Sequence, residues 1–356
     1  MHLIVVGIML LSGLLLAPAQ LLASCGQAFC PIETSSLAER PLLSGHLSLN
    51  IVHEYIDSDQ PRIGTSQARV GEIPRDHDEV FTQNHTTKFS LDYGITPRLS
   101  VGILIPFLQR HHRHIDKVEQ EIDEETVGGG LVETEFVDVV ERWTYQQLGD
   151  IQLTARYRLN QPLSPLQPSF SLIVGAKLPT GKTDFTNDTG EEAELTLQPG
   201  NGSWDGIVGF SYLQSLSLKT LRGKTALAPV FVTALSQFPV SVGKFGFQPG
   251  TELFFNIGFA YPVFRDIEFL GQINFHYQDR VSVGHAPGVE QPDTGRETLF
   301  LSPGIRYQLT KNIHLYTLAQ FPVYQRVNGI QIASDWNLTT GVSFRFHLPN
   351  LLSQAS

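Results

Sequence analysis

Residues 336–346, WNLTTGVSFRF, alternate between two kinds of side chain along their whole length. One set is largely apolar and consists of Leu338, Thr340, Val342, Phe344 and Phe346. The other set is polar or small and consists of Asn337, Thr339, Gly341, Ser343 and Arg345. Because successive side chains of a β-strand point to opposite faces, this period of two predicts a strand with one apolar and one polar side.

The same segment indicates what surrounds the strand. Its order of a polar residue, Gly341, Phe344 and Phe346 resembles the C-terminal signal by which bacterial outer-membrane barrels are recognised for insertion. If the two phenylalanines face lipid, the sheet has to close on itself, because unpaired strand edges cannot persist in hydrocarbon. We therefore expect a closed barrel that engages the barrel-insertion machinery through this signal.

Strand-like segments recur upstream at a spacing that suits an all-β, transmembrane, antiparallel up-and-down barrel. We delimit twelve of them, at 45–57, 79–94, 99–110, 143–159, 168–178, 203–215, 225–237, 250–261, 267–280, 297–309, 313–325 and 336–346. Their connections alternate between short and mostly longer ones, as in outer-membrane barrels with short turns at one end and long loops at the other. An antiparallel sandwich with one hydrated face is the alternative architecture.

The polar faces of these strands predict the interior of the barrel. Unpaired charges buried in a dry core would be strongly unfavourable, whereas an apolar outside and a hydrated inside accommodate both faces. The residues predicted to line the lumen are Lys88, Asp92, Arg156, Arg158, Glu252, Glu268, Asn274, His276, Arg306 and Arg345. Their mixed signs suit either a transverse field across a narrow pore or salt bridges that close it. As a hypothesis, Arg156, Arg158, Glu252 and Glu268 form the constriction.

The 356-residue chain begins with an apolar stretch. Residues 3–23 are the only window able to span a membrane as a helix, and Ala17-Pro18-Ala19 suits signal peptidase. A retained helical anchor is the alternative. The predicted organisation is a signal peptide at 1–23, a periplasmic arm at 24–43, an outer-membrane barrel at 44–346 and a C-terminal tail at 347–356. Both mature termini are expected in the periplasm.

Cys25 and Cys30 are the only two cysteines, and they follow the predicted signal peptide directly. A small disulfide loop in an oxidising periplasm is the favoured interpretation. Residues 22–25, LASC, also match a lipobox, in which Cys25 would become the lipidated first residue. A metal pair is the weakest reading, because two thiolates make only half of a tetrahedral zinc site.

The formal net charge is -10, and acidic residues are concentrated between positions 116 and 142. No basic cluster of useful size occurs, so nucleic acid is not expected as a partner. His111, His112 and His114 stand next to this acidic stretch, where imidazoles at such spacing can ligate zinc, copper or nickel. A solvated polar loop is the simpler interpretation of the same residues.

The sequence gives little support to an enzyme. Serine and histidine are plentiful, but no Gly-x-Ser-x-Gly elbow that would place a nucleophile beside a base occurs. We expect no catalytic residues and no cofactor.

Three segments resemble the outer-membrane family named for the meta-pathway of phenol degradation. They are 148–150 (LGD), 177–182 (KLPTGK) and 197–205 (LQPGNGSWD), and the likeness covers most of 79–346. Residues 25–30 and 73–79 look like a subgroup of that family. The resemblance implies a barrel in the outer membrane and the passage of hydrophobic or aromatic compounds.

Taken together, these features predict an outer-membrane channel or transporter for passive passage of small, hydrophobic or aromatic solutes. Its expected partners are membrane lipid, lipopolysaccharide and the solute itself. The alternative is a non-conducting barrel whose acidic and histidine-bearing loops bind metal ions or a surface partner.

Overall fold

The computed structural model describes residues 42, 44–72, 77–122, 133–220, 223–284 and 291–348, and they are almost entirely β-structure. Twelve strands form a ring: β1 (His46–Ile63), β3 (His77–Gly94), β4 (Leu99–Ile122), β6 (Gln152–Arg158), β7 (Ser169–Lys177), β8 (Asp205–Lys219), β9 (Thr225–Pro239), β10 (Glu252–Pro262), β11 (Ile267–Gln278), β12 (Arg296–Thr310), β13 (Ile313–Val327) and β14 (Ile330–His347). Outside the ring, β2 (Ser66–Gln67) pairs with β1, and β5 (Glu133–Leu148) pairs with β4. Two single-turn 3-10 helices, η1 (Lys244–Gly246) and η2 (Gln291–Asp293), lie in connections.

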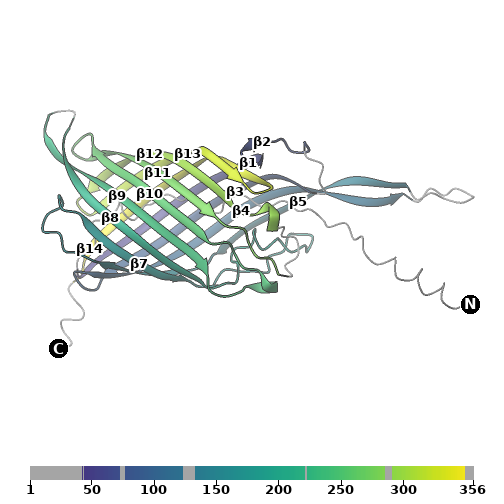
Figure 1. The fold of residues 1–356 in the computed structure, drawn as a ribbon, viewed down its shortest axis with the longest axis horizontal. Helices are drawn as coiled ribbons and strands as arrows, with labels where there is room; N and C mark the ends of the chain where they lie inside the picture. The colour runs from purple at the N-terminus through teal and green to yellow at the C-terminus, as the bar shows by residue number, and fades with distance from the viewer. Residues whose placement is uncertain are drawn as a thin grey trace, which may run out of the picture.

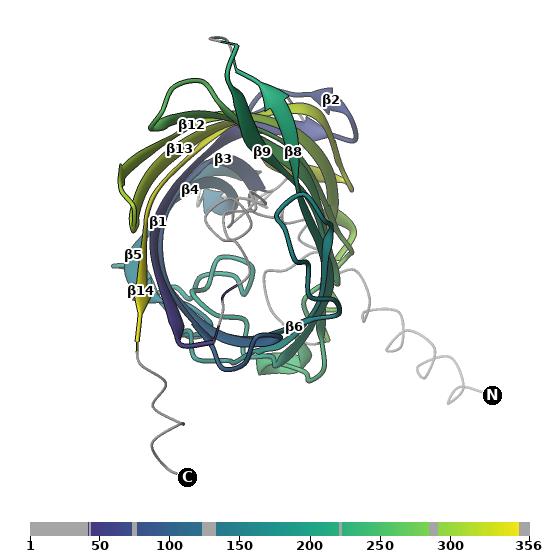
Figure 2. The same ribbon diagram turned by 90° about the vertical axis from the view of Figure 1, so that its left-hand side faces the viewer.

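The ring closes because the last strand pairs with the first. β14 runs antiparallel to β1 from the pair His46 and His347 to the pair Ile63 and Ile330. Every other neighbour in the ring is also antiparallel and next along the chain, once β2 and β5 are set aside. The closed antiparallel barrel of twelve strands expected from the sequence is therefore confirmed (Figures 1 and 2).

Side chains alternate between the two faces of the wall, as the period of two predicts. In β10, Leu253, Phe255, Ile257 and Phe259 are all more than two-fifths exposed, whereas Asn256 is buried. Aromatic side chains stand near the ends of several strands: Tyr93, Tyr157, Tyr261 and Tyr307 at the short-turn end, and Trp204 and Tyr277 at the other. Tyr55 and Trp336 lie side by side within β1 and β14. An apolar band flanked by aromatic residues is the outer surface that a bilayer requires.

The predicted fourth strand, 143–159, is wrong in its bounds. The structure divides it into β5 and β6, which pair with different parts of β4 and are separated at residues 149–151. The stretch 111–142, expected to be a loop, is mostly the continuation of β4 and β5 into a long hairpin beyond the ring (Figure 1). β-Branched residues face each other in this hairpin, as in the pair of Ile115 and Val140. Such residues favour extended backbone, so the strands continue although the segment is acidic.

The connection expected at 326–335 is also wrong, because β13 and β14 continue until only Asn328 and Gly329 separate them. Gly329 has a φ of 51°, in the left-handed region that tight hairpin turns require. An Asn-Gly pair between alternating apolar residues is a strong hairpin signal, and it could have revealed this turn from the sequence.

Several predictions concern residues outside the described ranges. These are the signal peptide at 1–23, the disulfide or lipidation at Cys25 and Cys30, nearly all of the arm at 24–43 and nearly all of the tail at 347–356. Among the residues that are described, no helix is long and apolar enough to cross a bilayer.

Candidate functional site in the barrel interior

The residues predicted to line the lumen stand on the inner face of their strands. The ladder places Lys88 and Asp92 on β3, Arg156 and Arg158 on β6, and Glu252 on β10 at positions that alternate with outward-facing apolar residues. The same alternation holds for Glu268, Asn274 and His276 on β11, Arg306 on β12 and Arg345 on β14.

Several of these inward charges are joined in pairs across neighbouring strands. Lys88 Nζ lies 2.7 Å from Glu54 Oε1, and His276 Nε2 lies 2.9 Å from Glu252 Oε2. Arg306 binds Glu268 through its guanidinium. Opposite charges therefore meet between neighbouring strands along the wall.

Uncharged polar side chains continue this lining without a break around several strands. Asn274 Nδ2 donates to Asn256 Oδ1 at 2.7 Å, and Ser302 Oγ donates to Asn274 Oδ1 at 2.6 Å. Arg158 Nη2 lies 3.5 Å from the carbonyl oxygen of Leu42, which brings the residue just before β1 to the inner face of β6.

An apolar belt interrupts the polar lining on one side of the interior. It is a contiguous group of buried side chains on β1, β9, β10, β11 and β13: Val52, Ile56, Phe231, Ala260, Leu270, Tyr316 and Leu318. Each stands at an inward position of its strand. The sequence reasoning overlooked this belt, because single apolar residues on otherwise polar faces look like irregularities until the register aligns them.

The belt is possible because glycines face its largest side chains. A Cβ on Gly258 would lie 2.4 Å from the ring of Phe231, and a Cβ on Gly341 would lie 2.3 Å from the ring of Tyr316. The ring of each aromatic residue thus occupies the space over the glycine opposite it on the neighbouring strand. Gly341, predicted to be part of the insertion signal, serves the interior in this way, while Phe344 and Phe346 stack 6.4 Å apart on the strand's other face.

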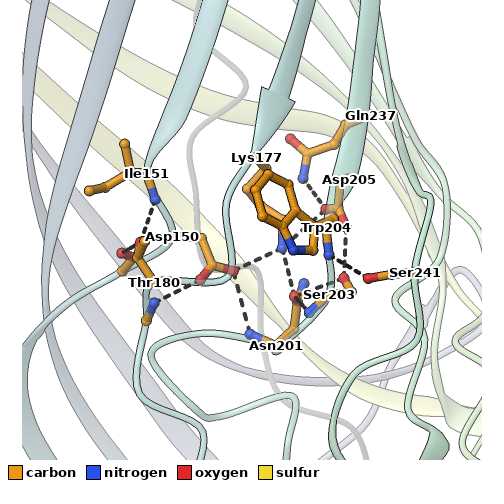
Figure 3. A network of polar contacts seen from close by, with 12 residues as sticks. Asp150, Ile151, Lys177, Thr180, Asn201, Ser203, Trp204, Asp205, Gln237 and Ser241 are labelled. Atoms are coloured by element: carbon orange, nitrogen blue, oxygen red, sulfur yellow. Dashed lines mark hydrogen bonds and ion pairs between the residues drawn. The ribbon is translucent and has the colours of Figure 1, made fainter.

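A buried lysine anchors the long connection between β7 and β8 (Figure 3). Lys177 Nζ lies 2.8 Å from Asp150 Oδ2, 3.1 Å from Asp205 Oδ2 and 2.6 Å from Asn201 Oδ1. Asp150 also accepts the backbone N–H of Gly181 at 2.9 Å. Since Lys177 and Asp205 are the two ends of the connection, this network ties them to each other and to the segment between β5 and β6.

Two glycines allow the ends of the same connection to touch. A Cβ on Gly181 would lie 2.7 Å from Cα of Gly200. A Cβ on Gly200 would likewise lie 2.7 Å from Cα of Gly181. Gly200 N donates to the carbonyl oxygen of Lys182 at 3.0 Å beside this contact. The three segments that resemble the family are therefore one structural unit, which closes the base of the connection.

Between these ends, residues 178–204 fold against the inner wall of β4 and β5. Arg110 Nη1 donates to the carbonyl oxygen of Leu197 at 2.8 Å, and Tyr145 Oη donates to the same oxygen at 2.7 Å. Trp143 Nε1 donates to the carbonyl oxygen of Glu191 at 3.3 Å and packs on Leu197. Figure 2 shows teal segments of this connection within the outline of the ring.

The same connection also reaches loops on the opposite side of the barrel. Leu195 packs with Phe247, Val281 and Val283, which lie in the connections that follow β9 and β11. Lys244, in η1, pairs with Glu192. β4 and β11 are far apart in the ring of twelve, so residues 178–204 extend across the mouth of the barrel at its long-loop end. We call residues 178–204 the mouth loop.

The structure separates the three histidines predicted as metal ligands. All three lie in β4 and not in a loop. His112 and His114 are inward and buried, whereas His111 is on the outer face, with Nδ1 3.3 Å from Thr144 Oγ1. The inward pair meets two acidic residues that the sequence reasoning did not include: Glu79 from β3 and Glu141 from β5.

This fold and its polar, partly apolar interior define an antiparallel barrel of the outer-membrane type. The family described as "Putative MetA-pathway of phenol degradation" matches residues 140–346. The chain belongs to this family, as its resemblance suggested. A search of curated proteins gives no match.

The architecture resembles that of a solved outer-membrane channel. The COG4313 outer membrane channel from Pseudomonas putida F1 is 15% identical, with a TM-score of 0.56 over 88% of this chain and 100% of that one. A Pseudomonas aeruginosa FadL homologue is 9% identical with a TM-score of 0.42, over 85% of this chain and 90% of that chain. The Ralstonia pickettii toluene transporter TbuX is 8% identical with a TM-score of 0.40, over 92% and 95%.

Proposed function

We propose that the protein is an outer-membrane channel for passive passage of small hydrophobic solutes, aromatic compounds among them. The observation that carries this proposal is the apolar belt among the charged and polar side chains of the inner wall. Its side chains pack against one another, so an apolar solute that enters among them would gain free energy that a purely hydrophilic lining does not offer.

A second support is that the protein from Pseudomonas putida F1, which shares the fold, is described as an outer membrane channel. The mouth loop lies across the entrance of this route and is held there by a small number of polar contacts. The protein acts without catalysis in this proposal, and the solute moves down its own gradient.

Planar-bilayer recording tests the proposal. The inserted protein should give stepwise ion currents, and a small aromatic solute such as phenol should interrupt them briefly by occupying the belt. Replacing Phe231 and Leu318 by alanine should shorten these interruptions, because the binding surface for an apolar ring is lost. A correctly inserted barrel that passes no current, or whose current ignores the aromatic solute in both proteins, contradicts the proposal.

Charge pairing along the inner wall leads to a prediction about ion selectivity. Glu268→Gln leaves the guanidinium of Arg306 without its carboxylate, so the interior becomes more positive and the reversal potential in a salt gradient should shift toward anions. Glu297→Gln is the matched control, because Glu297 and Arg326 form a similar pair on the outer face of β12 and β13. Equal selectivity in the two variants would show that Glu268 does not face the conducting path.

A further inference from the structure

Three adjacent strands bring metal-ligating side chains together inside the mouth of the barrel. His112 and His114 are two residues apart on β4 and therefore point to the same side. Glu79 on β3 stands opposite His114 in the ladder, and Glu141 on β5 stands opposite His114 on its other side. The ligand atoms of Glu79, His112 and His114 all lie within 4.8 Å of one another.

A second group of three shares His114 with the first. His114 Nε2 lies 2.9 Å from Glu141 Oε2 and 3.4 Å from Asp116 Oδ2. One ligand atom from each of these three residues lies within 4.8 Å of the other two. The two groups meet at His114 and together hold two imidazoles and three carboxylates, which is the ligand chemistry of zinc and related first-row divalent cations.

Burial distinguishes this cluster from an ordinary set of surface acids. Glu79 is 5% exposed, His112 is 2% exposed and His114 is 4% exposed. Placing a carboxylate out of water is costly unless a positive charge compensates for it, and a divalent cation compensates for two carboxylates at once. A carboxylate paired with protonated histidine is the metal-free arrangement that the same residues could form.

The orientation of His112 suits a metal ligand. His112 Nδ1 lies 2.8 Å from Thr82 Oγ1, and Nε2 lies 3.5 Å from Glu79 Oε2. When Nδ1–H donates to the threonine hydroxyl, the lone pair of Nε2 is directed at the space beside Glu79. A hydrogen bond that fixes the tautomer and ring orientation of a ligating histidine is the usual support around a metal site.

We propose that Glu79, His112 and His114, with Glu141 from the neighbouring strand, form a site for a first-row divalent transition metal, with zinc as the representative ion. The site joins β3, β4 and β5 at the base of their extension beyond the ring. It goes beyond the proposed solute passage and does not depend on it.

Trp143 connects this site to the mouth loop. Its ring lies 4.5 Å from the ring of His114 and 5.8 Å from that of His112. The other side of the same residue packs on Ala193 and Leu197 and donates to Glu191. A metal held by the histidines would therefore fix the surface against which the mouth loop rests, and Trp143 would report its binding.

Calorimetry with Zn(II) on the folded, tag-free protein in detergent tests the site. Both cysteines are changed to serine in all samples, because thiolates also bind zinc. One ion per chain should bind, and His112→Ala or His114→Ala should weaken binding at least a hundredfold. Thr82→Val should weaken it about tenfold, as expected for a group that orients a ligand. His111→Ala, on the same strand but the opposite face, should bind as the parent does.

Fluorescence gives a second measurement in a protein whose only tryptophan is Trp143, made by changing Trp204 and Trp336 to phenylalanine. Cu(II) should quench the emission at one equivalent, and His112→Ala should abolish that quenching. Heat-modifiable migration on gels confirms that each variant is folded. Zinc binding that is absent, or equally strong in His111→Ala and in a folded His112→Ala, overturns the proposal, whatever the conductance shows.

Discussion

Replacing Lys177 by methionine should lower the free energy of unfolding by about 3–5 kcal/mol, the usual effect of removing one partner from a buried ion pair. Lys177 is 4% exposed and contacts the carboxylates of Asp150 and Asp205 together with the side chain of Asn201. Without the ammonium group, two carboxylates remain close together with little access to water. Urea unfolding of the protein in detergent micelles, followed by tryptophan emission, measures the difference.

The control for this experiment is Lys182, a lysine within the mouth loop. Lys182 lies 3.7 Å from Asp184, but both side chains are largely exposed, so Lys182→Met should change stability by less than about 1 kcal/mol. Adding Asp150→Asn and Asp205→Asn to Lys177→Met should recover part of the loss, because the unpaired charges are then removed. If Lys177→Met and Lys182→Met unfold at the same urea concentration, the network does not stabilise the fold.

Shortening the mouth loop should have the largest effect on conduction. Lys182 and Gly200 are joined by a backbone hydrogen bond of 3.0 Å, so residues 184–198 can be replaced by a short Gly-Ser link without separating β7 from β8. Removing this segment takes away the contacts with Arg110 and Tyr145 on one side and with Phe247 on the other. Single-channel conductance in planar bilayers should rise severalfold.

A deletion at the opposite end of the barrel provides the comparison. Residues 161–167 connect β6 and β7 at the short-turn end, and Leu163 within them is 94% exposed. Shortening that turn should leave conductance at the parent value. Equal conductance in the parent and the mouth-loop deletion would mean that residues 178–204 do not restrict the path.

The role of the mouth loop clarifies what the family motifs do. Asp150, Lys177, Gly181, Gly200 and Asp205 all belong to the segments that carry the family resemblance. In the structure their side chains or close backbone contacts close the base of the loop. These motifs thus explain how the loop is held, while the apolar belt, which the proposed function needs, lies elsewhere on the wall.

The strand pattern was largely predictable because its cause is local. A period of two is set by neighbouring residues, so it identified the inward and outward faces of strands such as β10 and β11. It also placed Lys88, Glu252 and Arg306 on the interior before any register was known. The same rule predicts the ends of strands poorly. The extension of β4 and β5 depends on pairing between two separate segments, and a period within one segment does not show this pairing.

The periodicity of the residues is enough to predict a closed antiparallel barrel with an apolar exterior and a polar interior. That Phe231 and Tyr316 belong to one belt, and that residues 178–204 cross the mouth, becomes known from the folded chain. The folded chain also shows that Glu79 meets His112 and His114 while His111 faces outward. The physical reason is that a side chain's face depends on its own strand, whereas its neighbours depend on register and on loop paths that link residues far apart in the chain.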